Sequence, residues 1–343
     1  MGVTIKDVAR LAGVSPSTVS RVLAGSPRIS PKTQEKVRQA LKELNYHPHA
    51  GARSLVTGSS KTIGLITSRP IVQAFASTFF SEVIQGIGSV LEAEGYNLLL
   101  STALDEDAGR EACLEMLRSR HADGAILTMS RLDDPLINAL VAEKRHFVLI
   151  GRPADREGRL IPDVPYVNND NVSAAAAVVA HLVSLGHRRI GFITGLRERV
   201  YCYDRLQGYR KGLEEAGISY DPALVVEGNI TQADAGLALE RLMSLSDPPT
   251  AVMAGDDVLA LGALDAALRM GLRIPGDLAL SGFNDTPLWR WIRPRLTTVR
   301  IPMYDLGVMA ARMLIGLLKG RPSCPPYVIL PSQLIVREST TGS

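Results

Sequence analysis

Apolar positions in the first 45 residues recur at the spacing of short amphipathic helices. Thr4 and Asp7 form a capping-box pattern at the start of the first helix, and Gly13 follows its last apolar position. Ser15 and Ser30, each followed by proline, begin two further helices, because serine caps well and proline fits the first helical position. Three short helices, the first two joined by a glycine-containing turn, predict a helix-turn-helix unit.

From residue 61 onward, short β-rich apolar runs alternate with helical stretches, a pattern that predicts doubly wound parallel sheets. Eight strands in about 230 residues fit two such sheets, with a cleft between them, better than one. Segments 162–171 and 294–300 are expected to cross between the two lobes. The runs expected to be strands are 62–67, 97–101, 124–128, 147–150, 189–194, 224–227, 250–254 and 278–282.

The composition and the distribution of charge add a functional hint. The chain has 343 residues, of which 46% are hydrophobic and 21% are charged, so we expect a folded protein with more than one domain. Residues 1–60 carry a net charge of +6, which leaves −3 of the total of +3 for the remainder. A basic head on a slightly acidic body indicates a nucleic-acid-binding module, although an unevenly charged surface would give the same totals.

The outer face of the second predicted helix carries the candidate DNA contacts. Ser17 and Arg21 lie one turn apart on this face, away from the apolar positions. Arg21 can address O6 and N7 of a guanine with two hydrogen bonds, and Ser17 can donate or accept at either kind of base. A solvated helix face is the alternative. The candidate DNA-binding residues of this unit are Thr4, Ser15, Pro16, Ser17, Thr18, Ser20, Arg21 and Arg28.

Other classes of function find little support in the sequence. No apolar run of 18 residues occurs and charged residues occupy the N-terminus, so we expect a cytoplasmic protein with no membrane partner. Phosphate-binding loops, zinc-protease motifs and nucleophile elbows do not occur, and we expect neither a cofactor nor a metal. Cys113, Cys202 and Cys324 are interpreted as packing residues, and His181 and His187 as structural ones.

Two stretches of the sequence carry a family resemblance: GVSPSTVSRVL at 13–23 and LNYHPHAGARSL at 44–55. They resemble the DNA-binding head and hinge of the lactose/galactose repressor family, and the resemblance extends over nearly the whole chain. It implies a hinge that folds on DNA, with Leu55 inserted into the minor groove and Arg53 among the DNA contacts. Packing of Leu55 on the core is the alternative. Gly51 departs from the usual hinge and should cost about 1 kcal/mol of helix stability relative to alanine.

The resemblance also implies the organisation of the whole chain. We expect an all-α helix-turn-helix head at 1–45, a hinge at 46–60, and an α/β core at 61–343 that binds the effector and dimerises. The core is expected to have two doubly wound parallel-sheet lobes of the periplasmic-binding-protein-like type. Lobe 1 would comprise 61–163 and 295–322, and lobe 2 would comprise 164–292 and 326–343.

The expected function is that of an effector-responsive repressor of a carbohydrate-utilisation operon. A homodimer would bind a palindromic double-stranded DNA operator, because one short head covers only a half-site. A small-molecule effector, a sugar or sugar derivative, would control that binding. A sugar-modifying enzyme or a sugar-binding protein of the same fold stays open as the alternative, since fold alone does not decide function.

Candidate effector-binding residues lie where predicted strands end, since ligands of open α/β sheets bind beyond the carboxyl ends of the strands. Asp256 and Asn284 each follow a predicted strand, and Arg205 matches the family arginine that binds the effector. The resemblance implies that several relatives have asparagine in place of Asp256. Phe79 and Trp289 are candidate apolar walls for a sugar ring. The alternatives are core packing for the two aromatic residues, and a cap or an interlobe salt bridge for the three polar ones.

Overall fold

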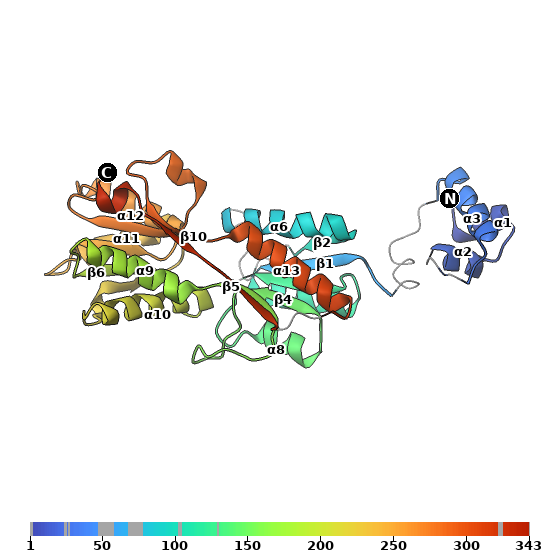
Figure 1. Cartoon of the computed structure of the whole chain (residues 1–343), viewed down its shortest axis with the longest axis horizontal. Coiled ribbons are helices and arrows are strands. Elements are labelled where there is room, and N and C mark those ends of the chain that lie inside the picture. The colour runs from blue at the N-terminus through green and yellow to red at the C-terminus, as the bar shows by residue number, and fades with distance from the viewer. Residues whose placement is uncertain are drawn as a thin grey trace.

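The computed structural model describes residues 3–23, 26, 28–46, 58–67, 78–101, 105–128, 130–321 and 325–342. The chain forms a three-helix unit at its N-terminus and two α/β lobes (Figure 1). The N-terminal helices are α1 (Ile5–Ala12), α2 (Pro16–Leu23) and α3 (Pro31–Glu43). The predicted helix-turn-helix head and the predicted pair of α/β lobes are therefore confirmed.

The three helices of the head are capped as the sequence predicts. Asp7 accepts a hydrogen bond from the backbone nitrogen of Thr4 at 2.9 Å, and Gly13 ends α1 with a φ of +66°, which glycine adopts without a steric penalty. Ser15 accepts from a backbone nitrogen in the first turn of α2, and Ser30 does the same for α3. The helices enclose a small core whose buried residues are Val8, Ala9, Ala12, Val19, Val37 and Ala40.

The first lobe is built on a parallel sheet with the strand order β11-β5-β4-β3-β1-β2, called sheet 1 below. Helices α6 and α13 pack on one face, and α7 and α8 pack on the other. The strands are β1 (Thr62–Thr67), β2 (Asn97–Leu100), β3 (Gly124–Thr128), β4 (Phe147–Ile150), β5 (Tyr166–Asn169) and β11 (Tyr327–Leu330). The helices are α6 (Thr78–Glu94), α7 (Glu106–Arg118), α8 (Pro135–Ala142) and α13 (Met303–Leu318).

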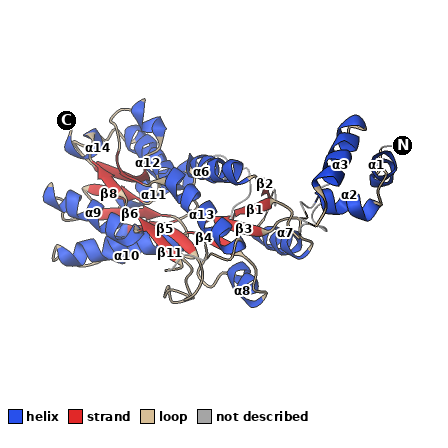
Figure 2. Ribbon diagram, turned by 45° about the vertical axis from the view of Figure 1, so that its right-hand side comes forward, coloured by secondary structure: helices blue, strands red, loops and turns tan. Residues whose placement is uncertain are grey.

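The second lobe repeats this plan on a sheet with the order β12-β10-β9-β8-β6-β7, called sheet 2. Only β12 runs antiparallel to its neighbour among the described pairs. Figure 2 shows helices on both sides of the strands. The strands are β6 (Ile190–Thr194), β7 (Val225–Glu227), β8 (Ala251–Ala254), β9 (Ala279–Asn284), β10 (Thr297–Arg300) and β12 (Gln333–Ile335). The helices are α9 (Asn171–Ser184), α10 (Val200–Glu215), α11 (Gln232–Met243), α12 (Asp257–Arg269), α14 (Glu338–Thr341), and the 3-10 helices η1 (Pro222–Leu224) and η2 (Pro287–Arg290).

In the described part of the chain, three short connections cross between the lobes. Strand β5 of sheet 1 leads into α9 of the second lobe, with Asp170 alone between them. Strand β10 of sheet 2 leads into α13 of the first lobe through Ile301 and Pro302. Strand β11 of sheet 1 continues into β12 of sheet 2. Any change in the angle between the lobes therefore has to be absorbed at these connections.

The strand pairing confirms the eight predicted strands, with ends shifted by one or two residues, and adds β5, β10, β11 and β12. These four strands correct the expected lobe boundaries. Residues 166–169 and 327–330 lie in sheet 1, although they were assigned to lobe 2. Residues 297–300 lie in sheet 2, although they were assigned to lobe 1. Within the segment 294–300, residues 297–300 therefore pair as a strand, and the chain crosses just after Arg300.

A single carboxylate fixes the point where the chain enters the first lobe. Asp123 Oδ1 accepts hydrogen bonds from the Ser60 backbone nitrogen at 2.6 Å and from the Ser60 hydroxyl at 2.9 Å. Its Oδ2 accepts from the Lys61 backbone nitrogen at 3.1 Å and from the Ser59 hydroxyl. Asp123 directly precedes β3. It therefore holds the end of the head-to-core linker against the loop between α7 and β3.

Candidate functional site

The second helix of the head presents a polar face to solvent. Pro16, Ser17 and Arg21 are exposed, whereas Val19 on the opposite side is buried in the core of the head. The Ser15 hydroxyl lies 2.8 Å from the Ser17 hydroxyl and so steadies the first turn of the helix. Within the described residues, the Arg21 guanidinium has neither an ion pair nor a hydrogen bond. It is therefore available to an acceptor outside the chain.

The remaining candidate DNA contacts divide into two groups. Thr4 and Arg28 are exposed, while Thr18 and Ser20 on α2 are half-buried. The Thr4 hydroxyl also donates to Asp7 at 2.6 Å, and this hydrogen bond holds the pKa of the Asp7 carboxyl below its usual value. Arg53 and Leu55 of the expected hinge lie outside the described residues.

A cavity that is open to solvent lies between the two lobes, and the empty space between its walls, its open mouth included, is about 630 Å³. In the first lobe its walls come from residues at the carboxyl ends of β4 and β5. In the second lobe they come from α10, the end of β9 and the residue that caps α12. Ligands of open α/β sheets bind at these ends of the strands. Phe79, Arg205, Asp256 and Asn284 line the cavity together.

Arg205 is a buried cation in the wall of this cavity, with 4% of the residue exposed. Its Nε donates to Asn171 Oδ1 at 3.0 Å, and its Nη1 donates to the carbonyl of Gly255 at 2.5 Å. The guanidinium also lies 3.8 Å from the ring centre of Phe283, a cation–π contact. Burial lowers the pKa of Arg205, but a guanidinium stays charged in proteins. Its Nη2 has no hydrogen-bond partner among the described residues and remains for a ligand.

Asn284 is the last residue of β9, Asp256 lies just after the neighbouring strand β8, and the two side chains contact each other. Asp256 Oδ1 caps α12 by accepting from the backbone nitrogen of Val258 at 2.9 Å. Its Oδ2 accepts from Asn284 Nδ2, also at 2.9 Å. Asp256 therefore lines the cavity and also caps a helix, so the predicted position and its alternative hold together.

The next residue, Asp257, is a buried carboxyl behind the cavity wall. Its oxygens accept hydrogen bonds from the Thr286 backbone nitrogen at 2.7 Å and from the Thr298 hydroxyl at 2.8 Å. Burial raises the pKa of Asp257 to about 7, because the interior disfavours the charged form. Asp257 is therefore a group whose charge changes near neutral pH.

Of the two aromatic candidates, one lines the cavity and the other does not. Phe79 lies in the first turn of α6 and lines the cavity, as predicted. Trp289 does not line it: the residue is 2% exposed and packs in the core of the second lobe with residues of α11 and α12. The prediction of Trp289 as a cavity wall is therefore wrong and the core-packing alternative holds, because η2 buries this ring and leaves Trp291 exposed.

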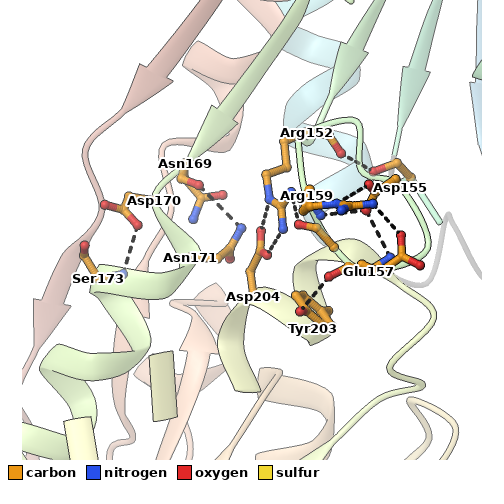
Figure 3. A network of polar contacts seen from close by, with 12 residues as sticks. Arg152, Asp155, Glu157, Arg159, Asn169, Asp170, Asn171, Ser173, Tyr203 and Asp204 are labelled. Carbon is orange, nitrogen blue, oxygen red and sulfur yellow. Dashed lines mark hydrogen bonds and ion pairs between the residues drawn. The ribbon is translucent and has the colours of Figure 1, made fainter. Parts of the chain in front are cut away.

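Sequence reasoning missed an ion pair in the cavity wall. Arg152, just after β4, donates two hydrogen bonds to Asp204 of α10 (Figure 3). Asp256 and Asn284 were indicated because ligands bind beyond the carboxyl ends of strands. The same reasoning would also have indicated Arg152, since it follows a predicted strand. This reasoning could not indicate Asp204, because Asp204 lies on helix α10 and its partner belongs to the other lobe. Polar Asn168 and Asn169 of β5 also line the cavity and were missed.

Other polar and reactive side chains have structural surroundings. Cys113 and Cys202 are buried thiols, in agreement with packing roles, and Cys324 lies outside the described residues. His181 and His187 each lie 2.9 Å from a threonine hydroxyl. Within the described ranges, no group of three histidine, cysteine, aspartate or glutamate residues could hold a metal ion. No helix in those ranges is long and apolar enough to cross a membrane.

A helix-turn-helix head joined to two lobes that share a polar cavity defines a two-part transcriptional regulator. Residues 4–49 match the family model described as bacterial regulatory proteins, lacI family, and residues 179–340 match that of a periplasmic binding protein-like domain. The chain is 35% identical to the HTH-type transcriptional regulator CelR of Thermobifida fusca, over 98% of both chains. It is 34% identical to the HTH-type transcriptional repressor CytR of Escherichia coli K12, over 98% of this chain and 96% of that one.

Solved structures agree with these relatives. A CelR–cellobiose complex has a TM-score of 0.74 at 33% identity, over 98% of this chain and 99% of that chain. A lac repressor dimer bound to operator and an anti-inducer has a TM-score of 0.82 at 28% identity, over 99% of both chains. The chain belongs to the LacI family of bacterial transcriptional regulators. Its function is DNA-binding regulation rather than catalysis, so the enzyme alternative is set aside.

Proposed function

We propose that this chain is a repressor that binds a palindromic operator as a homodimer, and that a sugar or sugar derivative in the interlobe cavity changes its affinity for that operator. The observation that carries the proposal is the cavity itself. A buried arginine with an unused donor, Arg205, faces a space formed by both lobes, on a chain that also has a helix-turn-helix head.

The head supports the operator half of the proposal. Its helix α2 is only eight residues long and can reach one half-site, so specific binding needs two heads. The lac repressor relative, solved as a dimer on its operator, supports the same arrangement. Arg21 and Ser17 would read base edges, and Thr4, Ser15, Pro16, Thr18, Ser20 and Arg28 would contact bases or the backbone around them. Arg53 and Leu55 would act at the minor groove.

The cavity supports the effector half. Its polar groups are amides, carboxylates and guanidinium groups, which suit the hydroxyl groups of a sugar, and Phe79 and Ile301 provide apolar surface. The structure of CelR with cellobiose supports a sugar as the class of ligand. The regulated genes would then serve carbohydrate use, and the protein would act in the cytoplasm, where the operator is.

The connections between the parts give a route for control. A ligand that binds both lobes favours one angle between them, and the three crossings have to adjust to it. Asp123 ties the first lobe to the end of the linker at residues 59–61, so a movement of that lobe also moves the end of the linker. We assign residues 1–45 to DNA reading, 46–60 to the hinge, and 61–343 to sensing and dimerisation. Ligand and operator are then coupled reciprocally.

A three-step experiment tests this function. Selection from random duplex DNA identifies the operator, sedimentation measures the number of chains on it, and a thermal-shift screen of sugars identifies a cavity ligand. We expect two chains per palindromic site and a sugar that both raises the melting temperature and alters operator affinity. A stable monomer at operator-binding concentrations would contradict the proposal, as would a cavity ligand that leaves operator affinity unchanged.

A further inference from the structure

The ion pair between Arg152 and Asp204 is unusual because its partners come from different lobes and both line the cavity. Arg152 Nε lies 2.9 Å from Asp204 Oδ2, and Nη2 lies 2.5 Å from Oδ1, so the fork of donors meets the carboxylate with two hydrogen bonds (Figure 3). Nη1 donates to the carbonyl of Gly158 at 3.0 Å. Every nitrogen of this guanidinium therefore has an acceptor from the protein.

Both partners are shielded from water. The side chain of Arg152 is 18% exposed and that of Asp204 is 4% exposed. Burial by itself would lower the pKa of Arg152, but the hydrogen bonds and charge of Asp204 outweigh it and the pKa is raised. Burial of this kind makes each charge depend on the other, because an unpaired charge in the same place would be strongly unfavourable.

The charges around the cavity cancel. Among the described residues, four charged side chains line it: Arg152 and Arg205 are cations, and Asp204 and Asp256 are anions. Arg152 is held by Asp204, and Arg205 is balanced at longer range by Asp256. Neither cation is left without a neutralising carboxylate.

A charged ligand would meet an unfavourable environment in such a site. A phosphate brings negative charge beside two carboxylates and finds no uncompensated cation, whereas a neutral polyol can use the free Arg205 Nη2 and the amides of β5. On the basis that the cavity is the effector site, we propose that the Arg152–Asp204 pair restricts it to uncharged, polyhydroxylated ligands. Asp204 is the residue that excludes phosphorylated ones.

A purely mechanical role, in which the pair only holds the lobes together, makes a different prediction. The lobes are also joined by Arg131 and Glu198, whose charged atoms lie 3.0 Å apart, and by the backbone of Val200 on that of Ser130 at 3.1 Å. Removal of one charge from the Arg152 pair should therefore change ligand selectivity without releasing the lobes. Either role allows a loss of stability, because one buried charge is left unpaired. Only the selectivity role predicts a change in the ligands that bind, and a purely mechanical pair would leave selectivity as it was.

The test uses inorganic phosphate as the probe, because this ion is small enough to enter the cavity. Its use does not require the natural effector to be known. Calorimetric titration compares the wild type, Asp204→Asn, and the double variant Asp204→Asn with Arg152→Gln, in the full chain at constant ionic strength. Asp204→Asn keeps the size of the side chain and leaves Arg152 without its counter-charge. We expect it to bind phosphate at least about tenfold more tightly than the other two proteins, which carry no uncompensated cation in the cavity.

The double variant separates this cavity from the surface arginines, which all three proteins share. Equal phosphate binding by all three proteins, or tight binding by the wild type, would overturn the proposal. Asp204→Ala replaces Asp204→Asn if the latter does not fold, with the same expected gain. The phosphate comparison does not depend on the sugar screen. Failure of every sugar to bind would therefore count against the effector assignment, and failure of Asp204→Asn to gain phosphate binding would count against the selectivity role.

Discussion

Asn284 Nδ2 donates a hydrogen bond to Asp256 Oδ2 at 2.9 Å, so two side chains at the carboxyl ends of neighbouring strands hold each other in place before any ligand arrives. The other Asp256 oxygen caps α12. The position of this carboxylate is therefore fixed by the fold of the second lobe. Such preorganisation lowers the entropic cost of ligand binding, and it also means that a change at Asp256 alters stability as well as recognition.

Asp256 allows these two effects to be separated. Asp256→Ala removes the cap of α12 and should lower the free energy of unfolding by about 0.5–2 kcal/mol. Asp256→Asn retains a good capping group and should stay close to the wild type in stability, while it changes ligand affinity because an acceptor and a charge are lost. Urea denaturation without ligand measures the first effect and titration with the screened sugar measures the second. Equal stability of the two variants would show that the cap is dispensable.

Arg21 should read a base pair. Arg21→Ala is expected to weaken binding to the selected operator by about 1–3 kcal/mol and to relax the preference at one position, because two hydrogen bonds to a base are lost. Lys32→Ala is a matched control, since Lys32 is an exposed cation on α3. It should weaken cognate and scrambled DNA alike if it contacts phosphate. Fluorescence anisotropy on both DNAs provides the comparison, and equal losses from both variants would refute base reading by Arg21.

Asp123 should transmit the state of the lobes to the head. Asp123→Ala removes the acceptor of four hydrogen bonds from residues 59–61, so the linker is no longer fixed to the first lobe. We expect sugar affinity to stay the same and the effect of sugar on operator affinity to shrink. Asp277→Ala is the control, because it breaks an exposed ion pair with Arg273 in the second lobe. A full sugar response in Asp123→Ala would show that coupling takes another route.

Asp257 gives a pH dependence with a definite sign. Its pKa is about 7 in the folded chain against an ordinary value of 3.8, so the folded state holds an extra proton between these values. The free energy of unfolding should therefore contain a contribution that falls as pH rises from about 4 to about 7 and is constant above that range. Asp257→Asn should remove it. Urea denaturation of both proteins at several pH values should give curves that diverge over this window, and parallel curves would contradict the assignment.

The sequence indicates some parts of this molecule better than others, for physical reasons. Apolar central strands such as β1 and β3 are recognisable because burial on both faces leaves continuous hydrophobic runs. Strand β5 was missed because its sequence ends in two asparagines, yet the fold buries Asn168 and Asn169 against the cavity. Edge strands β11 and β12 are short and half-exposed. Their pairing depends on where the chain crosses between the lobes, and the local pattern of apolar and polar residues does not show this.

The same contrast applies to the candidate site. Asp256 and Asn284 were predictable because they follow strands of one sheet, and a parallel sheet brings the carboxyl ends of its strands together. The Arg152–Asp204 pair depends on how one lobe faces the other. Trp289 was a candidate cavity wall because an aromatic side chain can cover the face of a sugar ring. The 3-10 turn η2 buries its ring instead, and only the three-dimensional path of the chain shows this.

The most direct test of ligand control is the operator affinity of the wild type and of Arg205 variants with and without the screened sugar. Arg205→Lys keeps the charge and loses the fork, and Arg205→Ala removes both; thermal melts establish that each variant is folded. We predict that sugar at sub-saturating concentration changes the operator affinity of the wild type only, while all three proteins bind the operator alike in its absence. An unchanged sugar response in folded Arg205→Ala would contradict the account.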